Sequence, residues 1–206
     1  MPHRLRVFAV SVLLGLGACD EGSGGSVQAQ PPRQVSEADT YVFFLAGRGQ
    51  DLSEAEVLAG KGFQVIAAPL ASDADLDFAA VAVKERIREL MARGAAMDRI
   101  ALVGKGEGGV LAMMVSGLAQ VPASSLVVAG ACPAQGTDGG EVYARMLSMH
   151  ARTIKGRFLS LVDPARPGTG SCAAVQNAAN GSEAWEIELE DSGRWVDEAA
   201  RWIRAR

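Results

Sequence analysis

The clearest chemical pattern in this chain lies at residues 100–118, IALVGKGEGGVLAMMVSGL. The apolar run 100–103 predicts a short buried strand, and apolar residues at helical spacing from Val110 onward predict a helix. The glycines between them form a turn too tight for side chains. Strand, glycine turn and helix are the frame of a G-x-S-x-G elbow, which holds a nucleophilic serine. Here the register is 104–108, and Gly106 stands where the serine would be, so the reactive hydroxyl is missing.

The same glycines fit a second pattern. Gly104, Gly106 and Gly109 spell G-x-G-x-x-G, the turn that binds dinucleotides after a strand. However, the next predicted strand, 126–130, ends without the acidic residue that would hold a ribose. Glu107 would also repel a pyrophosphate bound at this turn. The sequence therefore favours a structural glycine turn over a nucleotide site.

The first eighteen residues predict a signal peptide. Two arginines within the first six residues precede an apolar run, 7–16, that is too short to span a bilayer. The letters LGAC at 16–19 resemble the lipobox of bacterial lipoproteins, which implies that Cys19 is lipidated and becomes the new N-terminus. The alternative is an ordinary secretory peptide cleaved after Ala18, which would leave Cys19 a free thiol.

A polar segment separates this leader from the remainder of the chain. Residues 19–39 are rich in Gly, Ser, Gln and Pro and predict a flexible tether. We expect the lipid-anchored protein on the periplasmic side of the bacterial cell envelope. Asp20 resembles the inner-membrane retention residue of enterobacterial lipoproteins and indicates the inner membrane. No later stretch is long and apolar enough to cross a membrane, and we expect membrane contact through the lipid alone. The net charge of −4 argues against nucleic acid as a partner.

Residues 40–206 predict one domain in which strands and helices alternate. Such alternation requires right-handed crossovers and gives an α/β three-layer sandwich around a mainly parallel sheet of about six strands. The predicted strands are 41–46, 63–67, 100–103, 126–130, 157–162 and 184–189. The predicted helices are 54–60, 78–92, 110–118, 141–149, 171–179 and 195–203.

The order of these features resembles the α/β-hydrolase family, in its small secreted form without a lid domain. The landmarks are the strand before Gly47, the segment LAGKGFQVIAAPL at 58–70, the elbow, and the letters LVDP at 161–164. A final strand followed by Ser-Gly and a Trp-containing helix completes the set. The resemblance covers residue 41 to the C-terminus and implies a fold, whereas activity depends on the site residues.

The resemblance places the triad acid at Asp163, after a strand and before Pro164. It places the triad histidine in the loop after the last strand, 190–195, where the sequence has none and Arg194 stands nearest. An arginine does not deprotonate at neutral pH and cannot act as the base. Nucleophile and base are therefore both missing from the positions that the family uses, which are Gly106 and Arg194.

The resemblance also implies an oxyanion hole built from the backbone N–H groups of Arg48 and Glu107. Lys105 and Glu107 flank the elbow tip, and we expect their side chains to point away from the missing hydroxyl. His150 precedes the strand 157–162, at the opposite end of the sheet, and we expect a solvated residue at a helix end without a catalytic role.

Two cysteines remain once Cys19 is assigned to lipid. Cys132 follows one predicted strand, and Cys172 begins the helix after the next, so both belong to the same end of the sheet. In a protein outside the cytoplasm this arrangement predicts a disulfide, the alternative being two free buried thiols.

Together these features predict an envelope-anchored lipoprotein with a degenerate hydrolase site. We expect a non-catalytic protein that binds a small ligand or an envelope protein, without a cofactor or a metal. The alternative is a working esterase or acyl hydrolase that uses non-standard residues. The two differ in whether a simple ester is turned over.

Overall fold

The computed structural model describes residues 26–28, 32, 34–121, 124–134 and 140–205. The predicted signal peptide and Cys19 lie outside these residues. A seven-stranded sheet with the order β1-β3-β2-β4-β5-β7-β9 forms the centre of the fold, and every neighbouring pair is parallel. Its strands are β1 (Ser26–Gln28), β2 (Tyr41–Ala46), β3 (Gln64–Pro69), β4 (Ile100–Lys105), β5 (Ser125–Ala129), β7 (Gly156–Val162) and β9 (Ser182–Glu188). A short antiparallel pair, β6 (Cys132–Pro133) and β8 (Thr169–Gly170), stands apart from it.

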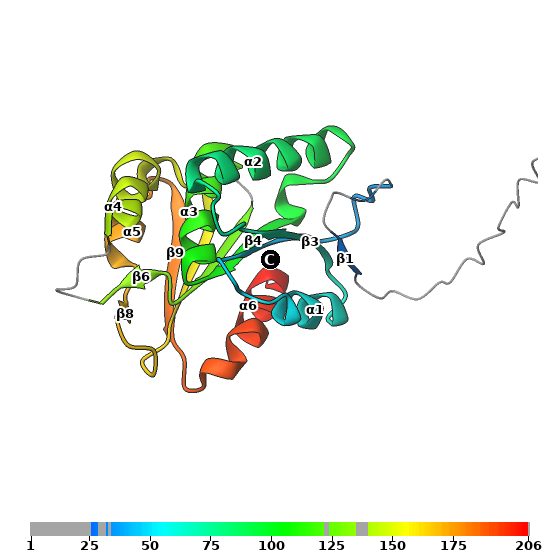
Figure 1. The fold of residues 1–206 in the computed structure, drawn as a ribbon. Coiled ribbons are helices and arrows are strands. Elements are labelled where there is room, and N and C mark those ends of the chain that lie inside the picture. Colours follow the sequence, from blue (N-terminus) through cyan, green and yellow to red (C-terminus); the bar gives the residue numbers. More distant parts are fainter. Residues whose placement is uncertain (1–25, 29–31, 33, 122–123, 135–139, 206) are drawn as a thin grey trace, which may run out of the picture.

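Helices cover both faces of the sheet, which gives the three layers that the sequence predicts (Figure 1). One face carries α1 (Ser53–Gly60) and α6 (Trp195–Arg204). The other carries α2 (Leu76–Ala92), α3 (Glu107–Ala119), α4 (Gly140–Met149) and α5 (Ala173–Ala178). Single 3-10 turns occur at Met97–Arg99, Ala151–Thr153 and Ser192–Arg194.

Strand β2 shows why the sheet needs two layers of helices. Its six residues are fully buried, and successive side chains point to opposite faces. Tyr41, Phe43 and Leu45 join the core beneath α2 and α3, whereas Val42, Phe44 and Ala46 join the core beneath α1 and α6. An apolar run without alternation is the mark of a strand covered on both sides.

The strand order also fixes where a site can form. The chain leaves β2 through α1 on one face and reaches β4 through α2 on the other, so β3 and β4 lie on opposite sides of β2. The loops after β2 and β4 therefore diverge and leave a crevice at the carboxyl ends of these strands. Ligands of open α/β sheets bind at such a switch point.

All six predicted strands are present in the sheet, with bounds that differ by one or two residues at some ends. Helix α3 begins at Glu107, three residues before the predicted start, because the glycine turn itself passes directly into the helix. The seventh strand, β1, comes from the segment that the sequence predicts to be a tether. Two further residues of this segment contact the domain. The Ser36 N–H donates to the Tyr41 hydroxyl at 2.8 Å, and the Pro32 carbonyl accepts from Arg93 at 2.8 Å.

The predicted disulfide between Cys132 and Cys172 is confirmed. The two Cα atoms are 5.3 Å apart, and the bond closes a sequence separation of 40 residues. Both residues are buried, and the bond lies beside the β6–β8 pair, which aligns Cys132 with Gly170. In the chain-entropy model a loop of this length contributes about 4 kcal/mol to the free energy of unfolding.

The expectation for His150 is wrong in one respect. The side chain is buried, with 7% of the residue exposed, because the end of α4 packs against Gly117 in α3. Burial lowers the pKa of His150, and the opposing effect of Asp77 is smaller. Nε2 has no hydrogen-bond partner among the described residues.

No helix in the described part of the chain is long and apolar enough to cross a membrane.

Candidate functional site

The elbow between β4 and α3 brings backbones closer together than side chains would allow. A Cβ on Gly104 would lie 2.3 Å from the Gly108 carbonyl oxygen, and a Cβ on Gly108 would lie 2.0 Å from the Leu45 carbonyl oxygen. A Cβ on Gly109 would lie 2.6 Å from the Ala131 Cβ. These glycines are needed because α3 starts directly against β2, β4 and the end of β5. The glycine pattern in the sequence is thus explained by packing.

Gly106 occupies the tip of this elbow. Its backbone has φ +56° and ψ −124°, a conformation that residues with side chains adopt only at a cost in free energy. Its N–H donates to the Ala129 carbonyl at 2.8 Å, which fixes the tip against β5. A Cβ at this position would lie 3.1 Å from one guanidinium nitrogen of Arg166 and 3.5 Å from another. The side chain of Arg166 therefore lies where a nucleophilic side chain would project.

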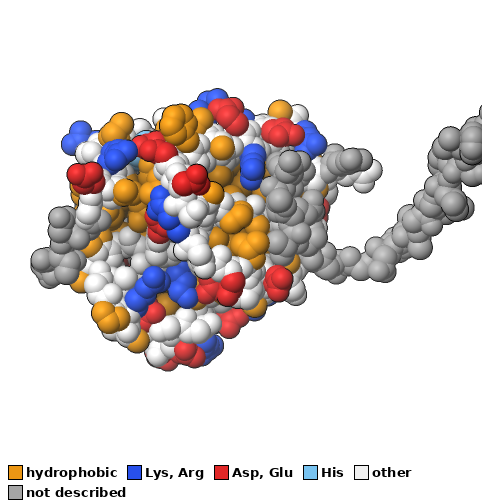
Figure 2. Space-filling model, viewed as in Figure 1, with side chains coloured by type: hydrophobic (Ala, Val, Ile, Leu, Met, Phe, Trp, Pro, Cys, Tyr) orange, Lys and Arg blue, Asp and Glu red, His pale blue; other side chains and the backbone are white. Residues whose placement is uncertain are grey.

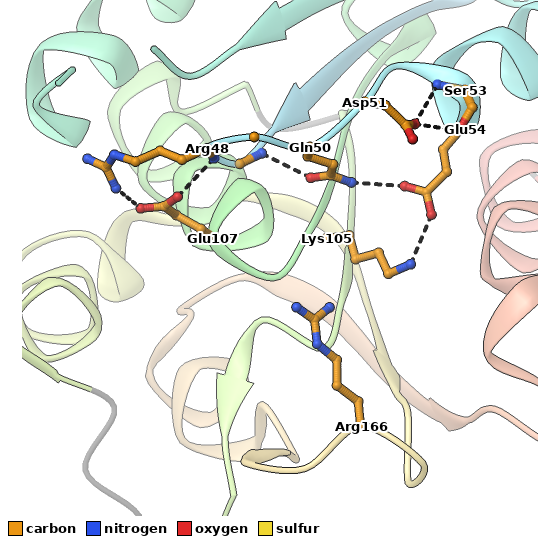
Figure 3. Close-up of a pocket in the computed structure, with 10 residues that line it drawn as sticks. Arg48, Gln50, Asp51, Ser53, Glu54, Lys105, Glu107 and Arg166 are labelled. Carbon is orange, nitrogen blue, oxygen red and sulfur yellow. Dashed lines mark hydrogen bonds and ion pairs between the residues drawn. The ribbon is translucent and has the colours of Figure 1, made fainter. Parts of the chain in front are cut away.

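A polar cavity of about 450 Å³ opens beside the elbow, at the switch point of the sheet. It is lined by the loop after β2, the first turn of α1, the end of β4, the start of α3 and the loop after β7. Figure 3 shows the charged and polar side chains that surround it. The lining residues are Gly47, Arg48, Gly49, Gln50, Asp51, Ser53, Glu54, Lys105, Glu107 and Arg166.

The position predicted to be an oxyanion hole holds a carboxylate. The Arg48 N–H donates to Glu107 Oε2 at 3.0 Å, and the Arg48 guanidinium forms an ion pair with Glu107 Oε1 (Figure 3). The same guanidinium donates to the carbonyls of Ser72 and Ala74 at 3.1 and 2.7 Å. The Arg48 N–H already donates to the negatively charged carboxylate of Glu107. An oxyanion that developed at this position would therefore be repelled rather than stabilised.

A second network holds the opposite wall of the cavity. Glu54 accepts from Lys105 at 2.9 Å, from Gln50 at 2.9 Å and from the indole N–H of Trp195 at 2.7 Å. Gln50 in turn accepts from the Gly47 N–H at 2.9 Å. Trp195 is buried, and the Lys105 ammonium lies 5.7 Å from its ring centroid. These bonds tie the loop after β2 to α1, β4 and α6.

Asp163 lies after β7, as the resemblance implies, and is 7% exposed. Its Oδ1 accepts from the Ala165 N–H at 3.1 Å and from the Ser192 hydroxyl at 2.8 Å. The residue that faces the acid is thus Ser192 rather than Arg194. Arg194, which the resemblance places at the position of the triad histidine, ends the 3-10 turn at Ser192–Arg194 and lines a separate hollow with Glu190, Asp191 and Glu198.

The charges of the cavity are largely paired. Arg48 pairs with Glu107, and Lys105 pairs with Glu54. The hydroxyl and N–H of Ser53 donate to Asp51, and these bonds lower the pKa of that carboxyl, with a smaller contribution from Lys105. Within the described residues the side chain of Arg166 has no hydrogen bond or ion pair. The described residues also contain no group of three or more His, Cys, Asp or Glu placed to hold a metal ion.

Sequence reasoning missed Arg166, Gln50 and Glu54. Arg166 lies 60 positions after the elbow tip, in a turn that carries no motif of its own. Gln50 and Glu54 follow the Gly47 loop, where only the strand order brings them beside Lys105. Ser192 was included in the landmark Ser-Gly pair, but the turn that aims it at Asp163 is a tertiary feature.

No family model matches the sequence, and no curated protein matches it. Solved structures do match. A structure of the metagenome-derived lipolytic enzymes LipS and LipT is 14% identical, has a TM-score of 0.56, and the match covers 88% of this chain and 100% of that one. A monoacylglycerol lipase of Paleococcus ferrophilus is 14% identical with a TM-score of 0.58, and the match covers 82% and 95%. A sugar hydrolase of Lactococcus lactis is 13% identical with a TM-score of 0.57, and the match covers 82% and 91%.

The fold is therefore that of the α/β-hydrolase esterases and lipases, as the resemblance predicts. At such low identity the similarity concerns the fold alone, and activity depends on the residues at the site. The site of this chain has a glycine at the elbow tip, a guanidinium over that glycine, and a carboxylate on the Arg48 N–H.

Proposed function

We propose that this chain is a non-catalytic binding protein built on the α/β-hydrolase fold. The observation that carries the proposal is the elbow tip: Gly106 has no side chain, and the Arg166 guanidinium lies 3.1 Å from the place where a Cβ would be. Loss of a triad nucleophile typically lowers turnover by about a millionfold. The residue facing Asp163 is Ser192, whose hydroxyl is too weak a base to replace an imidazole.

The contact between Glu107 and Arg48 supports the same proposal. An acyl-transfer enzyme needs neutral or positive hydrogen-bond donors where the oxyanion forms. Here the donor at Arg48 is held by a carboxylate, and the ion pair between the two side chains keeps that carboxylate in place. What remains is a hollow of about 450 Å³ with fixed walls, which suits binding of a small ligand.

We further propose that the domain is carried on the periplasmic side of the bacterial cell envelope by lipid on Cys19, followed by the segment 20–39. The residues LGAC at 16–19 support this proposal, because a cysteine after small residues and a short apolar run fits the lipobox. Asp20 favours the inner membrane. The occupant of the cavity is then a small molecule of the periplasm or a segment of an envelope protein.

The test of the proposed function is turnover of simple esters by the purified domain. We expect 4-nitrophenyl acetate and butyrate to be hydrolysed no faster than by a heat-treated sample. Turnover in the ordinary enzyme range of roughly 1–10³ per second would contradict the proposal. In that case variants Asp163→Asn and Ser192→Ala would show whether this pair takes part, with Arg152→Gln as a control at the other end of the sheet.

A further inference from the structure

The loop after β7 places the guanidinium of Arg166 over the backbone of two glycines. Arg166 lies against Gly106 at the elbow tip and against Gly130 after β5, where a Cβ would be 3.5 Å from its Cδ. Both glycines have positive φ, which leaves this surface without side chains. The backbone of Arg166 is fixed as well, because its N–H donates to the Asp163 carbonyl at 3.1 Å and its carbonyl accepts from the Thr169 hydroxyl at 2.9 Å.

The Arg166 guanidinium forms no ion pair with the described part of the protein. Arg48 and Lys105 are engaged by Glu107 and Glu54, and no comparable acceptor meets the Arg166 side chain among the described residues. Figure 3 shows its guanidinium pointing into the cavity, toward the space between the two ion pairs, without a hydrogen bond to either. A guanidinium that faces a cavity presents a planar fork of donors, and its best match is a carboxylate bound through two oxygens.

The other walls restrict the ligand further. The carboxylates of Asp51, Glu54 and Glu107 balance the charges of Arg48, Lys105 and Arg166, so the cavity has no net positive charge to hold a dianion such as phosphate. The same carboxylates are acceptors and favour a ligand that also carries a hydroxyl donor. Figure 2 shows basic and acidic side chains interspersed on the face in view, without a broad field of one sign that would attract polyanions.

We propose that the cavity binds a small hydroxy monocarboxylate, with the carboxylate on Arg166 over Gly106 and the hydroxyl toward the carboxylates of the facing wall. This inference rests on the proposed function, because a serine at the elbow tip would project into the place of the guanidinium. Arg166 is exposed to water, which weakens charged contacts, so we expect a dissociation constant of about a millimolar for a simple probe.

The experiment uses 4-fluoromandelate as the probe and 4-fluoromandelamide as its uncharged match. Fluorine NMR line widths are measured against protein concentration in low salt. We expect the acid to bind at least tenfold more tightly than the amide, and 0.5 M NaCl to weaken the acid selectively because the contact is ionic. Inorganic phosphate should compete poorly. Equal affinity of acid and amide would overturn the inference, and so would strong competition by phosphate.

Variants assign the binding to the guanidinium. Arg166→Gln should weaken binding of the acid about tenfold and leave the amide unchanged, whereas Arg166→Lys should retain part of the affinity because it keeps the charge without the fork. Arg152→Gln removes the same charge from an exposed residue before β7 and should have no effect. Circular dichroism and thermal melting verify that each variant is folded. Unchanged binding in Arg166→Gln would contradict the inference.

The methyl ester of the probe separates the two proposals. If the ester is converted to the acid by wild-type protein, the proposed non-catalytic function fails, whatever the affinities are. If the ester is stable but the acid does not bind through Arg166, the function survives and the ligand class is wrong. The ester and the acid give separate fluorine resonances, so hydrolysis appears as growth of the acid signal and binding as broadening of that signal.

Discussion

At the scale of single residues, the proposed function depends on a few positions around the elbow between β4 and α3. Gly106 provides an elbow tip without a nucleophile, and Glu107 supplies a carboxylate to the Arg48 N–H. Asp163 remains where the resemblance places the triad acid, but it accepts a hydrogen bond from Ser192. Hydrogen bonding to Asp163 can orient the Ser192 hydroxyl, but a hydroxyl cannot accept the proton of a nucleophile as the triad histidine does.

This geometry predicts which substitutions would restore reactivity. Gly106→Ser combined with Ser192→His should react with a fluorophosphonate probe faster than either single variant, because the imidazole would lie beside Asp163 and face the new hydroxyl. The strained backbone should make Gly106→Ser less stable than wild type by about 1–2 kcal/mol. The Arg166 side chain is long and can move the few tenths of an ångström that the new Cβ requires.

Labelling rates measured on intact protein check the prediction. The matched control is Gly106→Ser with Arg194→His, which places the imidazole on the outer side of the 3-10 turn and should label no faster than Gly106→Ser alone. Faster labelling of this control than of the Ser192→His pair would show that Arg194 lies nearer the elbow than the structure places it.

At the scale of elements, the elbow depends on how closely α3 begins against β2. The backbone of Gly108 faces the Leu45 carbonyl of β2, and Gly47 after the same strand lies beside the Glu107 side chain. Strand β2 lies inside the sheet between β3 and β4, so a shift there would propagate to both neighbours. The glycine turn of the elbow is therefore also a packing element of the core.

We expect Gly108→Ala to lower the free energy of unfolding by about 3 kcal/mol, because the added Cβ would lie 2.0 Å from a backbone oxygen that cannot move alone. Gly60→Ala is the matched control: no atom lies within 4 Å of its Cβ position at the end of α1. There the lower entropy of the unfolded chain should raise stability by roughly 0.5 kcal/mol. Urea denaturation measures both, and equal effects would contradict the close packing described here.

At the scale of the whole molecule, the proposed anchor and the cavity lie in separate parts of the chain. The part of segment 26–39 that the structure describes runs beside β3 and Tyr41, at the edge of the sheet. The cavity opens at the carboxyl ends of β2 and β4. Among the described residues, those that line the cavity begin at Gly47, so none of them comes from the predicted tether.

The anchor predicts a labelling result in bacteria that express the full chain. An alkyne-bearing palmitate should mark the wild type and should not mark Cys19→Ser, because acyl transfer needs the thiol. Cys132→Ser should be labelled as the wild type is, since Cys132 is committed to the disulfide. If Cys19→Ser incorporates as much palmitate label as the wild type, the proposed lipid anchor at Cys19 is excluded.

The sequence by itself determined the fold class, six strands of the sheet, the elbow and the disulfide. These features depend on local pattern: apolar runs, helical periodicity, glycine spacing and cysteines placed after neighbouring strands. The missing hydroxyl at Gly106 could also be read directly, because a single letter decides it.

Only the tertiary structure decided what occupies the site. Arg166 meets Gly106 across 60 positions, and Glu54 meets Lys105 across 51 positions, because the strand order brings these loops to one edge of the sheet. One 3-10 turn decided that Ser192, and not Arg194, faces Asp163. The burial of His150 depended on the packing of α4 on α3, and no local pattern carries such long-range contacts.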